Sequence, residues 1–191
     1  NNNNLLIFNH SSVFDNLLIG YILTRNNINY LQLKSISKES RNIQNKINQY
    51  LGHLLINKSL KNDIVKLRKI NNNWKKINNI NVILFPEGTI ATEKNLLKSK
   101  FNYLLSPKIG IYNNLVNLIS FDNVYDITFC FSLNGKKILG ERNILGNISH
   151  PNIRIDIIIT DVTKQHKQDN FLNNLWENKD KVIDNILKKY Q

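Results

Sequence analysis

Residues 5–24 read LLIFNHSSVFDNLLIGYILT. Leu5 to Asn9 is a short apolar run that ends in a polar residue, which is typical of a buried strand. From Ser11 to Thr24 the apolar residues instead recur at helical spacing, and Ser11 or Ser12 suits the N-cap position. A strand that leads directly into a helix is the repeating unit of α/β folds.

Further strand-like and helix-like segments alternate along the rest of the chain. We expect strands at 28–36, 54–56, 81–85, 124–131 and 153–159, and helices at 40–51, 63–77, 109–119 and 171–190. Only 3 prolines and 7 glycines occur, and we see no linker. The pattern predicts a single α/β domain over residues 1–191, with a mixed, mainly parallel sheet flanked by helices. Ligands on such sheets bind at the carboxyl ends of the strands.

The composition is that of a globular, basic domain. The chain has 191 residues, of which 41% are hydrophobic and 21% are charged, so it is not expected to be disordered. The 26 Lys and Arg residues outnumber the 14 Asp and Glu residues, which gives a formal net charge of +12. Such a charge suits anionic lipid headgroups or nucleic acid. Because the lysines are spread along the chain without a recognised aromatic–basic motif, nucleic-acid binding is the less favoured alternative.

Several classes of protein are excluded or disfavoured. No apolar run approaches the roughly 20 residues of a membrane-spanning helix. The only cysteine, Cys130, excludes an internal disulfide and a Cys-based zinc site, and we expect it to pack as a small apolar residue. His53, His150 and His166 lack metal-ligand spacing with carboxylates, so we expect no metal. The chain has no methionine, so we expect it to be the inner part of a longer protein.

The first candidate site is the junction between the opening strand and its helix. A histidine at a helix start can turn toward a carboxylate about one turn further on. Asp15 would then hold one ring nitrogen of His10 and leave the other free as a general base, with no protein nucleophile. The structural alternative is that His10 caps the helix and Asp15 only favours its positive end. No Gly-x-Ser-x-Gly elbow surrounds Ser11 or Ser12, which argues against a serine nucleophile.

Two further candidates follow the next strands. In residues 85–89, Pro86 ends the strand and Gly88 permits an unusual turn or the close approach of a ligand. Glu87 stands where ligand contacts are expected. The alternative is that residues 85–89 form an ordinary turn that ends the strand and binds no ligand. Lys58 follows the strand at 54–56 and could bind an anion such as phosphate, and the alternative there is a solvated lysine.

Taken together, these motifs resemble a known family. Residues 9–15 read Asn-His-x-Ser-x-x-Asp, a strand ending in a basic residue follows, and residues 85–89 read Phe-Pro-Glu-Gly-Thr. This ordered set is similar to that of the glycerophospholipid acyltransferases, the 1-acylglycerol-3-phosphate acyltransferase family. Segments 106–110, 124–128 and 171–180 are also similar, most of all to the lysocardiolipin and lysophosphatidylinositol acyltransferase branch.

The resemblance implies a reaction and a set of site residues. His10, oriented by Asp15, would remove the proton from a glycerol hydroxyl of a lysophospholipid. That hydroxyl would attack the thioester of acyl-CoA directly, without an acyl-enzyme and without a cofactor. The implied acceptor-binding and phosphate-binding residues are Lys58, Glu87, Gly88 and Thr89, and the implied supporting residues are Asn9, Ser12, Pro86 and Pro107.

Two departures from the family pattern bear on the acceptor. Lys58 replaces the usual Arg, which keeps the charge but loses the bidentate fork. Ile90 stands where typical lysophosphatidate enzymes have a second Arg, which points to an acceptor that carries a headgroup. These departures leave open a catalytically inactive lipid-binding relative.

The resemblance also implies a location. We expect a membrane-associated enzyme on a surface with anionic lipids, at the endoplasmic reticulum or another intracellular membrane. The apolar N-terminal helices that the family usually carries would precede residue 1.

Overall fold

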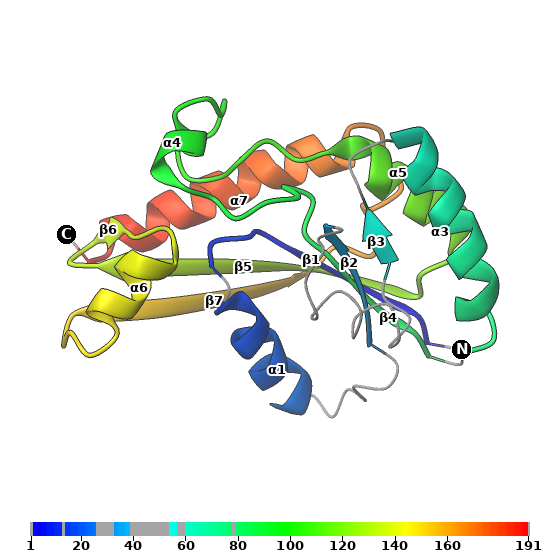
Figure 1. Ribbon diagram of the computed structural model, residues 1–191. Coiled ribbons are helices and arrows are strands. Elements are labelled where there is room, and N and C mark those ends of the chain that lie inside the picture. The colour runs from blue at the N-terminus through cyan, green and yellow to red at the C-terminus, as the bar shows by residue number, and fades with distance from the viewer. Residues whose placement is uncertain are drawn as a thin grey trace.

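The computed structural model describes residues 2–12, 14–25, 33–38, 54–56, 60–77 and 79–190. Within these ranges the chain forms a seven-stranded sheet with helices on both faces (Figure 1). The strands are β1 (Asn4–Phe8), β2 (Leu33–Lys38), β3 (Leu54–Ile56), β4 (Asn81–Leu84), β5 (Asn123–Leu133), β6 (Lys136–Lys137) and β7 (Ile153–Asp161). The helices are α1 (Asp15–Arg25), α3 (Leu60–Trp74), α4 (Glu93–Leu96), α5 (Ile109–Leu118), α6 (Glu141–Asn147) and α7 (Phe171–Lys188).

The sheet is mixed and mainly parallel, which confirms the predicted fold class. Its order is β3-β2-β4-β1-β5-β6, and β7 also pairs with β5. Strand β1 lies parallel to both β4 and β5, and β2 lies parallel to both β3 and β4. Only β6 and β7 run antiparallel to β5. The predicted helix at 40–51 lies outside the described residues.

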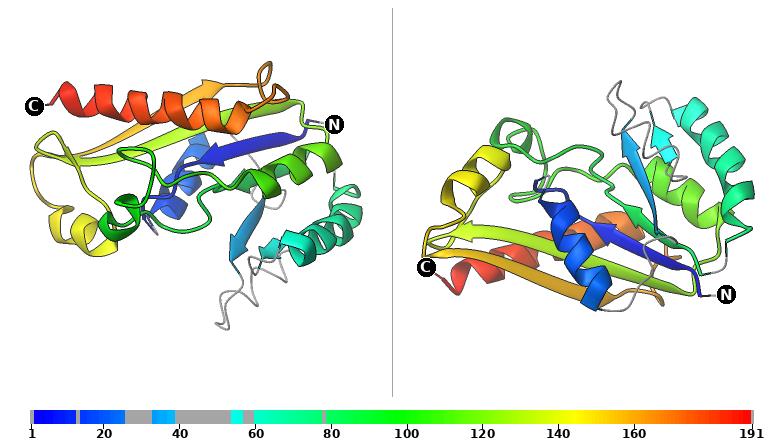
Figure 2. Two further views of the ribbon diagram at one scale, coloured as in Figure 1. Left: turned by 90° about the horizontal axis from the view of Figure 1, so that it is seen from above. Right: turned by 60° about the horizontal axis from the view of Figure 1, so that its bottom comes forward.

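The two faces of the sheet carry separate cores. The larger core lies under α3, α5 and α7 and contains the fully buried Trp176. The smaller lies under α1 and α6 and contains Phe8, Phe129 and Phe131. Cys130 points to the opposite face from these two phenylalanines of β5, and it is fully buried, as expected. Figure 2 shows α7 along one face and α1 against the other. None of the helices in the described segments is long and apolar enough to cross a bilayer.

Two of the differences from the sequence-based expectations lie at α1 and after β5. Helix α1 begins at Asp15 rather than Ser11, because the backbone amides of Ser11 and Ser12 donate to the Asp15 carboxylate instead of entering the helix. The hairpin from β5 to β6 was not predicted. It turns through Asn134 and Gly135, which both have positive φ angles, and Asn-Gly is a typical sequence for such a turn.

Candidate active site

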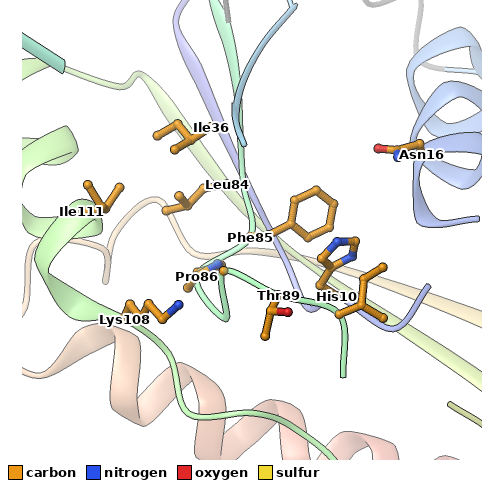
Figure 3. A pocket seen from close by; sticks show the side chains of 11 residues that line it. His10, Asn16, Ile36, Leu84, Phe85, Pro86, Thr89, Lys108 and Ile111 are labelled. Atoms are coloured by element: carbon orange, nitrogen blue, oxygen red, sulfur yellow. The ribbon is translucent and has the colours of Figure 1, made fainter. Parts of the chain in front are cut away.

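The first and second candidate motifs meet at the carboxyl end of two parallel strands. Strand β1 pairs with β4, with Ile7 opposite Leu84. The chain continues from β1 into His10 and from β4 into residues 85–89, so both motifs emerge on the same edge of the sheet. Between them lies a cavity of about 300 Å³ (Figure 3).

The His10 and Asp15 side chains are in hydrogen-bonding contact. His10 Nδ1 lies 2.8 Å from Asp15 Oδ2. The same oxygen accepts hydrogen bonds from the backbone amides of Ser11 at 2.8 Å and Ser12 at 3.1 Å. Because an ionised carboxylate only accepts hydrogen bonds, Nδ1 carries the ring proton and Nε2 is left as the acceptor. His10 lines the cavity, whereas Asp15 is fully buried behind it.

The loop that carries His10 is fixed from both sides. The buried Asn9 side chain continues the pairing of β1 with β5, because its Oδ1 accepts from the Phe129 amide at 2.8 Å and its Nδ2 donates to the Phe129 carbonyl at 2.9 Å. The His10 carbonyl accepts from the amide of Ala91 at 2.8 Å. The Phe85 ring packs against the imidazole with centroids 4.3 Å apart. These contacts hold the imidazole in one orientation.

The cavity has one polar side and one apolar side. Figure 3 shows His10 and Thr89 on one side, and Lys108 at the start of α5 with its Nζ directed toward the turn after β4. The apolar side consists of Ile36, Leu84 and Ile111. Such a surface suits an amphiphilic substrate with a polar reacting end.

Glu87 does not line the cavity. Its side chain is 2% exposed and points into the interior. Neither carboxylate oxygen has a hydrogen-bond partner among the described residues. Burial raises the pKa of Glu87 to about 8, against the lowering effects of the Lys137 and Lys179 charges and the backbone amide of His10. Burial likewise lowers the pKa of Lys137, whose ammonium donates to the Tyr103 carbonyl. The geometry favours a role for Glu87 beneath the site over direct contact with the acceptor.

The raised pKa of Glu87 predicts a pH-dependent stability. Between its ordinary pKa near 4.5 and about 8, the folded state keeps a proton that the unfolded state releases, so the free energy of unfolding falls as pH rises. The slope contributed by this group is at most about 1.4 kcal/mol per pH unit. We expect Glu87→Gln to remove this component, as measured by urea unfolding at pH 5, 6, 7 and 8. Glu177→Gln, at an exposed position, is the matched control, and equal slopes for all three proteins would contradict the prediction.

A buried ion pair between Lys179 and Asp126 lies behind the site. Lys179 Nζ on α7 lies 2.6 Å from Asp126 Oδ1 on β5, and the lysine side chain has no exposed area. The same ammonium donates to the Ile127 carbonyl at 2.9 Å. Burial raises the pKa of Asp126, while the Lys179 charge opposes that rise. The pair fixes α7 to β5 at the strand that supports Asn9.

A family model described as Acyltransferase matches residues 1–132. This match spans β1 to β5 and includes the His10 loop and the turn after β4. The chain belongs to the acyltransferase family. No curated protein and no solved structure matches it.

The residues expected from sequence fall into four groups in this acyltransferase domain. His10, Pro86, Gly88 and Thr89 line the cavity, and Asp15, Asn9 and Ser12 support the His10 loop from buried positions. Glu87 and Pro107 are absent from the cavity lining, and Lys58 lies outside the described residues.

Phe85, Asn16 and Lys108 also line the cavity, although none of them was predicted as a site residue. The signal for Lys108 was its place in the Ser-Pro-Lys block at 106–108. In the described ranges, no three His, Cys, Asp or Glu side chains gather as metal ligands. The expected lack of a metal and of a cofactor stays a prediction.

Proposed function

We propose that this acyltransferase moves a fatty acyl group from acyl-CoA to the free glycerol hydroxyl of a lysophospholipid. The observation that carries the proposal is the 2.8 Å contact between His10 Nδ1 and Asp15 Oδ2 at the wall of the cavity. An imidazole held in this way presents Nε2 as a base and has a carboxylate to stabilise its charged form.

The proposed reaction needs no protein nucleophile. His10 Nε2 takes the proton of the acceptor hydroxyl while the hydroxyl oxygen attacks the thioester carbonyl. The resulting intermediate collapses as the carbon–sulfur bond breaks, and the imidazolium returns its proton to the departing CoA thiolate. Asp15 stays ionised throughout and stabilises the imidazolium.

The acceptor is proposed to carry a headgroup on its phosphate. Ile90 lines the cavity directly after Thr89, where lysophosphatidate enzymes of the resembling family have a second Arg. An apolar side chain there cannot donate the paired hydrogen bonds with which an Arg guanidinium would hold a bare phosphomonoester. The resemblance also suggests Lys58 as a contact for the acceptor phosphate.

We also propose that the enzyme works on an anionic membrane surface. The face of the molecule that carries α1 and α6 leaves large apolar side chains exposed, namely Leu17, Tyr21, Leu145, Ile148, Ile155 and Ile159. Asn16, beside Leu17, lines the cavity, so this face lies next to the site. An apolar surface on a chain of net charge +12 suits an anionic bilayer, from which a lysophospholipid would reach His10. We propose that this bilayer is an intracellular membrane, as the resemblance suggests.

An acceptor panel tests this proposal. Full-length protein in vesicles receives oleoyl-CoA with lysophosphatidate, lysophosphatidylinositol or lysocardiolipin, and the free CoA thiol is measured. We expect acceptor-dependent release that is fastest with a headgroup-bearing acceptor and faster on anionic than on zwitterionic vesicles. No release with any acceptor, from protein shown to be folded, would overturn the proposal in favour of an inactive lipid-binding relative.

A further inference from the structure

Strand β7 has one edge without a partner strand among the described residues. Its other edge pairs antiparallel with β5 over nine residues, from Ile153 opposite Leu133 to Asp161 opposite Tyr125. In the described ranges β7 pairs with no strand but β5, and Figure 1 shows it at the border of the sheet. A long edge strand presents a row of backbone N–H and C=O groups that can pair with another chain.

The outer edge of β7 has few of the features that protect edge strands from pairing. Such strands are usually short, or they carry lysine, proline or a bulge. β7 pairs with β5 without interruption over its nine residues and contains neither lysine nor proline. Ile155 and Ile159 are 43% and 50% exposed. The edge is therefore open to a further strand, and the side chains of β7 indicate which strand fits.

The charges at the start of β7 are complementary to themselves. Arg154 and Asp156 lie on the same side of the sheet as Cys130. If two β7 strands pair antiparallel around Ile155, Arg154 of each copy lies directly opposite Asp156 of the other. Within the described structure, Asp156 Oδ2 is buried without a hydrogen-bond partner, and Arg154 contacts the ring of Tyr190. A guanidinium from a second copy would give the Asp156 carboxylate the donor that it lacks.

The same two charges disfavour the neighbouring registers. Moving the centre of pairing from Ile155 to Arg154 places the two arginines opposite each other. Moving it to Asp156 places the two aspartates opposite each other. Because like charges directly opposite destabilise a strand pair, the register centred on Ile155 is the one of these three that the charges favour.

We infer that β7 pairs with β7 of a second copy of this chain, with a twofold axis through Ile155. Such an axis is perpendicular to the sheet, so the α1 and α6 faces of both copies point the same way. Ile155 and Ile157 lie on that face, opposite Phe131 and Phe129, so the isoleucine rows of the two copies join. This arrangement lets both copies dock on one bilayer. That consequence rests on the proposed membrane surface, whereas the pairing itself does not.

Disulfide trapping locates the axis. Full-length Ile155→Cys protein is oxidised with copper phenanthroline, and we expect a linked dimer because Cα atoms at the axis would lie about 4.5 to 5.5 Å apart. Ile157→Cys is the matched control on the same face, since its two cysteines would lie roughly 13 Å apart. Wild-type protein, whose only cysteine is the buried Cys130, gives the background. Linkage of Ile157→Cys in preference to Ile155→Cys would overturn this register.

Exchange of the two charges tests the pairing without a cross-link. Arg154→Glu leaves two acids at this place and Asp156→Arg leaves two bases, so each variant alone should raise the Kd of the dimer about 10-fold or more, as measured by mass photometry. A mixture of the two variants should form dimers again, because each charge then faces its opposite. Lys94→Glu changes an exposed lysine of α4 and should have no effect. Circular dichroism checks that every variant is folded.

The result for wild-type protein separates this inference from the proposed function. Wild-type protein that stays monomeric at micromolar concentration, together with Ile155→Cys protein that does not cross-link, overturns the inference even if the monomer is an active acyltransferase. Dimers that the charge variants weaken and their mixture restores support it, even if the protein turns over no acceptor and the proposed function fails.

Discussion

His10→Ala is expected to lower the rate of acyl transfer by a factor of about 10² to 10⁴, the usual contribution of a positioned general base. The imidazole lines the cavity, and its Nδ1 lies 2.8 Å from Asp15 Oδ2, so its removal takes away the only imidazole among the described residues that line the cavity. The loop itself is held by Asn9 and by the backbone of Ala91. The variant should therefore fold, and circular dichroism checks that it does.

Two further variants sharpen the His10 result. His150→Ala changes an exposed histidine and should leave the rate unchanged. Asp15→Asn should lower kcat without a matching rise in the acceptor KM. The neutral amide of Asn cannot stabilise the imidazolium as the Asp15 carboxylate does, and it does not fix the tautomer in which Nε2 is the acceptor. Folded His10→Ala protein with the wild-type rate would show that another group removes the proton.

Lys179→Met is expected to destabilise the fold by about 3 to 5 kcal/mol, the typical cost of leaving a buried charge without its partner. Methionine is nearly isosteric with the lysine stem, so the loss comes from the ammonium that lies 2.6 Å from Asp126. The pKa of Asp126, already raised by burial, should rise further. Wild type and variant both lose folding stability as pH rises above the unfolded pKa of Asp126. Their difference grows only above the folded-state pKa of wild-type Asp126, where that carboxyl ionises beside Lys179, so the deficit of the variant should grow with rising pH.

Chemical unfolding of three variants and wild type checks this expectation. Lys188→Met breaks an exposed pair with Asp184 and should cost less than about 1 kcal/mol. The double variant Lys179→Met with Asp126→Asn removes both buried charges and should recover much of the loss. A deficit that is independent of pH and persists in the double variant would show that packing around Trp176, not charge, is what Lys179 supplies.

The fold was predictable wherever local pattern and tertiary packing agree. The apolar runs at residues 5–8 and 82–84 belong to central strands, buried on both faces, which need continuous hydrophobicity. The helical spacing of residues 171–190 was equally informative, because α7 buries one stripe against the sheet. The short α6 was missed, since seven residues give little periodicity and its burial comes from Ile144 packing on distant β5.

The types of residue in the site were predictable, but which of their side chains face the cavity and which are buried was not. The spacing of His10 and Asp15 indicated their contact, because five residues at a strand–helix junction bring the two side chains together. The inward direction of Glu87 could not be read from the sequence, since it follows from the turn at Pro86 and Gly88. The approach of Lys108 to Gly88 joins segments 20 residues apart and depends on how α5 starts.

The most direct test of direct acyl transfer to a lysophospholipid is one assay that counts both products. Full-length protein is given oleoyl-CoA and lysophosphatidylinositol, and the free CoA and the diacyl phospholipid are measured together, the latter by mass spectrometry. Direct attack by the acceptor hydroxyl predicts one diacyl phospholipid for each CoA released and no CoA release without acceptor. Release of CoA with free oleate in place of diacyl product would show that the His10 site hydrolyses thioesters, and would contradict the account.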